Sequence, residues 1–206
     1  MSMLILRALP AMFVAMPLTA QAYDQLPKPL ARLSPEQVAQ KIRIENDPLD
    51  RFMTLSTQPS WQRGRSITGA YATDVHLRAL VDRETGKTRW QVWHELDYRG
   101  NARHFTAVAY RTGGQRVEVP LQDVENWNDY NVDNDGFRRH SQHARIVFEL
   151  PERVVMDIAA SYRAGSREPW RLRFVERGGQ NVTGGLAPSE VAGLVQALQK
   201  WQGQAR

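Results

Sequence analysis

Three consecutive segments alternate between apolar and polar residues, and this alternation constrains the fold more than any other feature. The segments are residues 73–82, 88–98 and 102–111. A period of two over this length is typical of β-strands that have one buried face. The sequence therefore predicts a meander of three antiparallel strands in the middle of the chain.

Two short turns join these strands and set the residues that face each other. Residues 84–87 contain Gly86, where a hairpin loop needs a positive φ, and Gly100-Asn101 fits a two-residue turn. Matching apolar to apolar positions then fixes the register. The predicted opposite pairs are Val75 with Leu96, Val81 with Trp90, His76 with Glu95, Arg78 with Trp93, Leu96 with Phe105, Val92 with Ala109, and Asp97 with His104.

One side of the meander is expected to be core and the other side to be polar. The candidate catalytic residues on the polar side are His76, Glu95, Asp97 and His104, and the candidate binding residues are Arg78 and Trp93. Cross-strand neighbours lie about 5 Å apart, so each histidine would reach a carboxylate, as in a general acid/base pair. Opposite charges are also the ordinary composition of a solvated sheet face, which is the interpretation we favour.

Residues 1–22 have the pattern of a secretory signal peptide. Arg7 precedes an apolar stretch broken by Pro10 and Pro17, and residues 20–22 (Ala-Gln-Ala) give a small-x-small cleavage site. The apolar stretch is shorter than the roughly 20 residues that a membrane-spanning helix needs. We therefore expect a periplasmic or secreted protein that has no transmembrane anchor after the signal is removed.

The chain has 206 residues, no cysteine and a formal net charge of +5. The absence of cysteine excludes disulfides, thiol nucleophiles and thiolate metal sites. Nearly all the positive charge is arginine, and basic character in an exported protein favours an anionic envelope polymer or lipid head groups as a partner. Nucleic acid is not expected, because the arginines form no basic run and the signal directs the chain out of the cytoplasm.

Helices are predicted near both ends of the chain. Ser34, Pro35 and Gln37 form a capping box that begins a helix reaching about Ile44. Near the other end, helical spacing predicts one apolar stripe, made of Val191, Leu194, Val195, Leu198 and Trp201. Further strands are predicted at residues 116–121, 144–150, 154–163 and 170–176, and residues 123–136 have the least regular pattern.

The fold class that these patterns predict is α+β and mainly antiparallel β. We expect a hairpin/meander sheet or a sandwich, with an N-terminal and a C-terminal amphipathic helix packed on it. Residues 23–206 should form a single β-rich domain, long enough for a sizeable core. A Gly-Gly-Gln sequence recurs at residues 113–115 and 178–180, which suggests two similar sheet halves at about 65–121 and 144–186.

Two patterns resemble metal sites without completing one. Residues 131–136 (Asn-Val-Asp-Asn-Asp-Gly) match the start of a calcium loop, but Gln142 stands where such a loop has a bidentate glutamate. Two histidines three residues apart, close to aspartates, are the kind of ligand that zinc takes. The candidate metal ligands are Asp133, Asp135, His140 and His143. An ordinary Asp/Asn-rich turn without a cofactor is the interpretation we favour.

No sequence motif identifies a reaction, since nucleophile-elbow, phosphate-loop and dinucleotide-binding patterns are all missing from the sequence. Our first hypothesis is a non-enzymatic binding or accessory protein of the bacterial envelope, whose partner is an anionic polymer, a carbohydrate or a protein. The alternative is a hydrolase that acts on an envelope or carbohydrate substrate through the His/carboxylate cluster, with residues 123–143 as a lid. The candidate sugar-stacking residues are Trp61, Trp93, Trp127 and Trp170.

Overall fold

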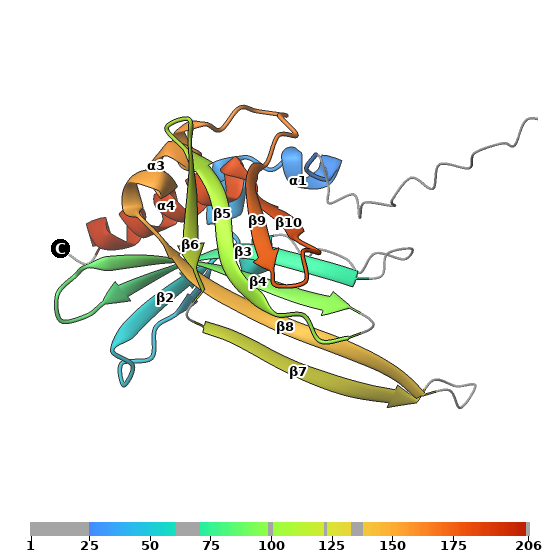
Figure 1. Cartoon of the computed structure of the whole chain (residues 1–206). Coiled ribbons are helices and arrows are strands. Elements are labelled where there is room, and N and C mark those ends of the chain that lie inside the picture. Colours follow the sequence, from blue (N-terminus) through green and yellow to red (C-terminus); the bar gives the residue numbers. More distant parts are fainter. Residues whose placement is uncertain (1–24, 61–70, 99–100, 122, 133–137, 205–206) are drawn as a thin grey trace, which may run out of the picture.

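A computed structural model of the chain describes residues 25–60, 71–98, 101–121, 123–132 and 138–204 (Figure 1). Its described part contains ten strands in two antiparallel sheets, together with four α-helices. The predicted α+β, mainly antiparallel fold class is therefore confirmed. The predicted signal peptide at 1–22 lies outside the described residues and stays a prediction.

Six strands form the larger sheet, and each neighbouring pair is antiparallel. In spatial order they are β1 (Arg43–Glu45), β2 (Phe52–Ser56), β3 (Tyr71–Asp82), β4 (Thr88–Tyr98), β8 (Arg138–Leu150) and β7 (Asp123–Val132). The smaller sheet has four strands: β10 (Val182–Leu186), β9 (Trp170–Glu176), β5 (Phe105–Thr112) and β6 (Gln115–Pro120). Its strands run steeply across those of the larger sheet (Figure 1).

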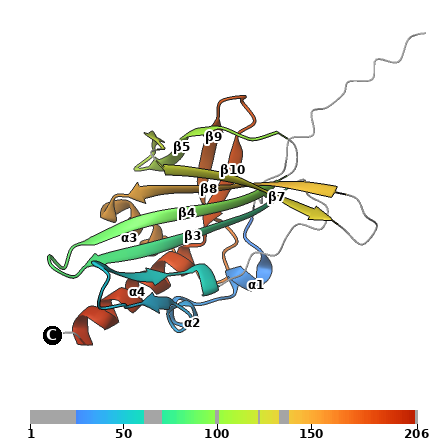
Figure 2. The same ribbon diagram turned by 90° about the horizontal axis from the view of Figure 1, so that it is seen from below.

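The helices are α1 (Lys28–Ala31), α2 (Pro35–Ala39), α3 (Glu152–Ala160) and α4 (Pro188–Gln204). A 3-10 turn covers Gln58–Ser60. The long helix α4 lies beside α2, close to β2 and β3 (Figure 2). The predicted stripe of α4 is confirmed, because Val191, Leu194, Val195 and Leu198 are buried in the core and Trp201 packs against it.

The core lies between the two sheets and is closed by α3 and α4. The predicted inner faces of β3 and β4 are confirmed, and their buried members are Val75, Leu77, Ala79, Val81, Trp90, Val92, His94, Leu96 and Tyr98. Across the sandwich, the ring centroids of His94 and Phe174 are 4.0 Å apart. A Cβ on Gly184 of β10 would lie 2.9 Å from Val75 Cγ2, so the sheets approach closely there and leave no space for a side chain.

The third strand predicted for the meander is present as β5, but its predicted pairing with β4 is wrong. β5 does not pair with β4 but leaves for the smaller sheet, where it pairs with β6 and β9, and β8 takes the place beside β4. Val108 and Tyr110 of β5 lie in the core, and Ala107 and Ala109, which were predicted to face it, lie on the other side of the strand. The sequence prediction relied on the tendency of consecutive strands to pair, but β4 and β5 belong to different sheets.

The predicted register of the first hairpin is wrong by two residues. Val75 lies opposite His94 rather than Leu96, and Val81 lies opposite Thr88. The hairpin closes earlier than predicted, with the Asp82 N–H donating to the Lys87 carbonyl at 2.9 Å. An even shift keeps every side chain on its predicted face, which is why the inner face was still correct. The positive φ predicted at Gly86 is confirmed at 68°.

Three local predictions are also wrong. The capping box at Ser34 is present, but its helix ends at Ala39, and β1 occupies positions that were expected to be helical. Residues 123–132 of the supposedly irregular segment form strand β7. Residues 154–163 were expected to be a strand, yet helix α3 forms at Glu152–Ala160, since Val154, Val155 and Ile158 bury one helical stripe in the core.

Candidate functional site

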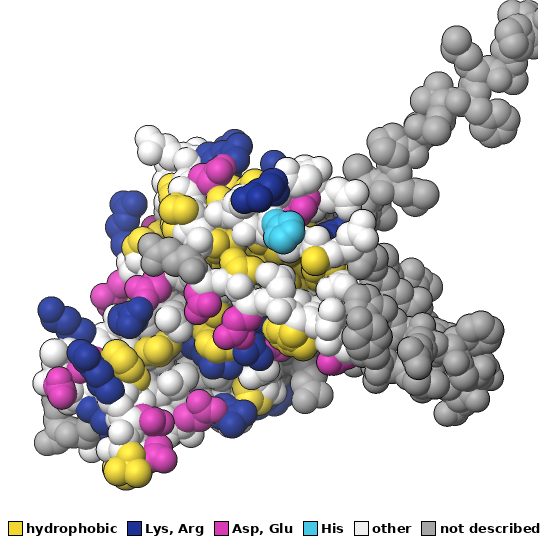
Figure 3. Space-filling view, turned by 60° about the horizontal axis from the view of Figure 1, so that its bottom comes forward, with side chains coloured by type: hydrophobic (Ala, Val, Ile, Leu, Met, Phe, Trp, Pro, Cys, Tyr) yellow, Lys and Arg dark blue, Asp and Glu magenta, His cyan; other side chains and the backbone are white. Residues whose placement is uncertain are grey.

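The outer side of the larger sheet carries most of the residues that the sequence singled out. We call this surface the polar face; its members are His76, Arg78, Trp93, Glu95, Asp97, Glu125, Trp127, Asp129, His143 and Arg145. They come from β3, β4, β8 and β7, whose alternation directs every second side chain away from the core. On the underside of the molecule, acidic, basic and apolar side chains are interspersed (Figure 3).

One end of the polar face is a stack around Trp93. The Arg78 guanidinium lies 3.6 Å from the centroid of the indole, in cation–π geometry. Arg78 Nε also lies 3.3 Å from His76 Nε2, and His76 is buried beneath this stack at 1% exposure. Burial lowers the pKa of Arg78 below its ordinary value, while nearby Glu45 and Glu95 act in the opposite direction. The predicted binding residues therefore contact each other.

The other end of the polar face is centred on His143. Its Nδ1 lies 2.6 Å from Asp97 Oδ1, and its Nε2 lies 3.3 Å from Asp129 Oδ2. The indole of Trp127 covers the imidazole at a centroid distance of 5.2 Å and an angle of 9°. The Nδ1 contact is a hydrogen bond to Asp97, whereas Nε2 is buried and forms no hydrogen bond with a described residue, so Asp129 is only a nearby charge.

Arg145 joins the two ends of the polar face. Its Nε lies 3.3 Å from Glu95 Oε1, and its Nη1 lies 3.0 Å from Glu125 Oε2. The guanidinium also lies 5.4 Å from the ring centroids of both Trp93 and Trp127. The charges on this face therefore largely satisfy one another, as in a structural network.

The structure brings only part of the predicted catalytic cluster together. Asp97 lies opposite His143 of β8, whereas His104 is exposed in the segment that leads into β5 and accepts the Arg177 N–H at its carbonyl. His76 lies opposite Trp93 rather than Glu95. The sequence missed these pairings because the partner strand β8 lies about 50 residues further along the chain than β4.

The predicted metal ligands are only partly within the described residues. Asp133 and Asp135 lie outside them, and His140 belongs to β8 with a side chain that is not described. His143 is placed on the polar face, as given above. Among the side chains that are described, no group of three or more histidines and carboxylates could hold a metal ion.

A second surface, on the outer side of the smaller sheet, was not anticipated from the sequence. We call it the arginine row; its members are Arg111, Arg116, Arg171 and Arg173, all of which are exposed. Arg111 of β5 lies directly opposite Arg116 of β6. Arg173 of β9 lies opposite Ala109 of β5, so the row crosses three neighbouring strands.

The arginine row is only partly neutralised. Arg116 Nη2 lies 2.5 Å from Glu118 Oε2, but Arg111 and Arg173 form no ion pair with any described residue. Small residues lie between the guanidinium groups, with Ala109 opposite Arg173 and Gly185 opposite Arg171. Part of this row could have been predicted from the sequence. A tight turn at Gly113-Gly114 places Arg111 opposite Arg116.

Comparisons of the chain with protein-family models, with curated proteins and with solved structures find no match. Of the helices in the described ranges, none has both the length and the apolar composition needed to cross a bilayer. The function must therefore be inferred from the two outer faces and from the cavities of the molecule.

Proposed function

We propose that this protein is a non-enzymatic binding protein of the bacterial envelope, and that its arginine row contacts an anionic polymer. The observation that carries the proposal is the direct opposition of Arg111 and Arg116 beside Arg173. Like charges at directly opposite positions destabilise a sheet, and of Arg111, Arg116 and Arg173 only Arg116 forms an ion pair with a described residue. A bound polyanion offsets this repulsion.

The spacing of the row favours a polymer over a single small anion. Neighbouring strands lie about 4.8 Å apart, so guanidinium groups on three strands span roughly 10 Å. Each guanidinium can bind a carboxylate or phosphate through two parallel N–H donors. A chain of regularly spaced acidic groups could engage arginines along the whole span of roughly 10 Å, which is longer than a single small anion.

The predicted export signal supports an envelope polymer as the partner. A protein carried out of the cytoplasm meets acidic polysaccharides and lipid head groups rather than nucleic acid. We therefore place the protein in the periplasm or outside the cell as part of this proposal.

The polar face gives less support to the alternative hydrolase. Nδ1 of His143 is hydrogen-bonded to Asp97, and Nε2 is buried beneath Trp127, so neither nitrogen is within reach of a substrate proton. Glu95 is likewise engaged by Arg145. These contacts favour a structural role for the network.

A binding experiment with polymers of matched size tests the proposal. The purified protein should bind polygalacturonate in preference to neutral dextran, with an affinity that falls as salt is added. Removing one arginine charge near an anionic surface costs about 1 kcal/mol, so Arg111→Gln and Arg173→Gln should each weaken binding about fivefold. Arg89→Gln removes an equal charge from the outer side of β4, where Arg89 pairs with Glu149, and serves as the control. Equal binding of both polymers, or unchanged binding by both row variants, would contradict the proposal.

A further inference from the structure

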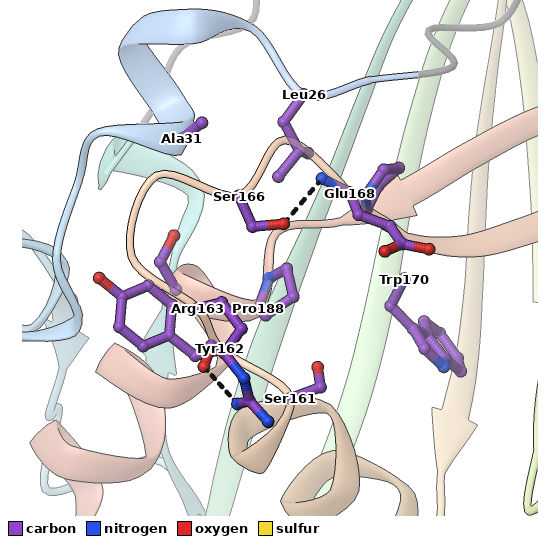
Figure 4. Close-up of a pocket in the computed structure, with 11 residues that line it drawn as sticks. Leu26, Ala31, Ser161, Tyr162, Arg163, Ser166, Glu168, Trp170 and Pro188 are labelled. Carbon is purple, nitrogen blue, oxygen red and sulfur yellow. Dashed lines mark hydrogen bonds between the residues drawn. The ribbon is translucent and has the colours of Figure 1, made fainter.

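A cavity of about 300 Å³ opens between the N-terminal segment, the connection from α3 to β9, and the start of α4 (Figure 4). This volume is at the lower end of the range for small-molecule sites. None of the strand alternation or helix patterns predicted it, because its walls come from three segments far apart in the sequence. It is lined by Leu26, Ala31, Ser161, Tyr162, Arg163, Ser166, Glu168, Pro169, Trp170, Pro188 and Ser189.

One wall of the cavity is apolar and contains an indole. Leu26 and Pro169 contribute aliphatic surface, and Trp170 is half-buried beside them. The Trp170 ring packs on Tyr110 at a centroid distance of 5.2 Å, which fixes its orientation from the core side. A fixed, partly exposed indole is a suitable stacking surface for the apolar face of a flat ligand.

Ser189 is the buried polar group of the cavity. It is 4% exposed, and its hydroxyl makes no hydrogen bond to any described residue. The hydroxyl is not among the buried side-chain atoms that lack a partner, so it is open to the cavity, where it can both donate and accept a hydrogen bond. Ser189 is also the second residue of α4, where backbone N–H groups have no partner within the helix.

The other hydroxyls of the cavity keep hydrogen-bonding capacity. Ser161 Oγ donates to the Ile158 carbonyl at 2.6 Å and can still accept. Ser166 Oγ accepts the Glu168 N–H at 3.3 Å and can still donate. Both hydrogen bonds are formed with nearby backbone groups. They hold the two hydroxyl groups in place and still leave each of them able to form a further hydrogen bond.

A cation and a carboxylate also border the cavity. Arg163 Nη1 is held by the carbonyls of Ala160 at 3.2 Å and Tyr162 at 2.7 Å, which fixes its guanidinium at the edge. Glu168 is exposed on another part of the lining (Figure 4). Because both signs of charge are present, the cavity does not select a simple anion or a simple cation.

We propose that this cavity binds a single sugar ring. A sugar offers an apolar ring face to Trp170 and several hydroxyl groups, which both donate and accept, to Ser161, Ser166 and Ser189. The charged groups of Arg163 and Glu168 then bond further hydroxyls at the edge. This site lies apart from the arginine row and does not rest on the function proposed for it.

Ligand-observed saturation-transfer NMR on the full chain tests the inference. The probes are D-glucose, N-acetyl-D-glucosamine and D-glucuronate, with glycerol as a polyol that has no ring. At least one sugar should receive saturation and glycerol should not. Trp170→Leu should weaken binding at least tenfold, whereas Trp127→Leu, which removes an exposed indole from the polar face, should leave it unchanged.

A second variant guards against misfolding of Trp170→Leu. Ser166 is exposed in the loop, so Ser166→Leu should fill the mouth of the cavity and keep the fold. It should also abolish the sugar signal, with an unchanged far-UV spectrum and melting temperature. The inference is overturned if no sugar receives saturation, or if a folded Ser166→Leu protein binds as tightly as the original.

Discussion

Gly193 in α4 gives the sharpest test of how the helices pack. A Cβ at this position would lie 2.6 Å from Val38 Cβ and 2.7 Å from the Pro35 carbonyl oxygen. Neither atom is the end of a flexible side chain, so α2 and α4 would have to separate. Forcing extra volume into a packed contact costs up to about 3 kcal/mol, and alanine gains about 1 kcal/mol of helix propensity over glycine.

The net effect expected for Gly193→Ala is therefore a loss of about 2 kcal/mol. For a domain of this size that corresponds to a fall in Tm of about 4–8 °C, measured by thermal unfolding followed by circular dichroism. Gly203 is the matched control, because it lies in the same helix and no atom would come within 4 Å of its Cβ. Gly203→Ala should be neutral or stabilising by up to about 1 kcal/mol. If the two variants are equally stable, the close packing of α2 on α4 is refuted.

Two further predictions concern ion pairs. Hydrogen bonds from Arg51, and then from the Thr85 N–H, hold the pKa of Asp82 below its ordinary value, so the stability it adds is present above about pH 4 and is lost as the pH falls through the folded-state pKa. Asp82→Asn should lower Tm near neutral pH, and the gap to the original protein should close in acid; a constant gap would contradict this. Asp97→Asn and His143→Gln should couple by about 0.5–1 kcal/mol in a double-mutant cycle of urea unfolding, and additive effects would contradict the 2.6 Å contact.

Local patterns predicted the faces of the elements better than the partners of the elements. The alternation in residues 73–82 and 88–98 correctly predicted both strands and their buried sides. The capping box at Ser34 was correct, because it depends on two hydrogen bonds within four residues. The predicted end of that helix was wrong, because no local signal marks the start of β1 at Arg43. Interactions that close within one turn are visible in a sequence, whereas tertiary competition is not.

The candidate site shows the same limit. The residues of β4 that point outward, Glu95 and Asp97, were identified from period two alone. Their basic partners, Arg145 and His143, lie on β8, and only the strand order of the sheet brings them into register. A hydrogen-bonding pair between strands so far apart in sequence depends on topology, which alternation does not encode.

The arginine row depends on the same change of strand partner that the sequence prediction missed. In order along the chain, β3, β4, β5 and β6 make two antiparallel hairpin pairs split between the sheets, and β7, β8, β9 and β10 repeat this connection. The repeats meet where β4 pairs with β8 and β5 pairs with β9. Arg111 and Arg116 come from the first set of four strands and Arg173 from the second.

Had β5 stayed beside β4, as the sequence predicted for the meander, these charges would lie on different sheets. The single domain at 23–206 with two similar halves stays a prediction, and this repeated connection of strands is in keeping with it. The surface that we propose for polymer binding is thus a product of the pairing between the two sets of strands.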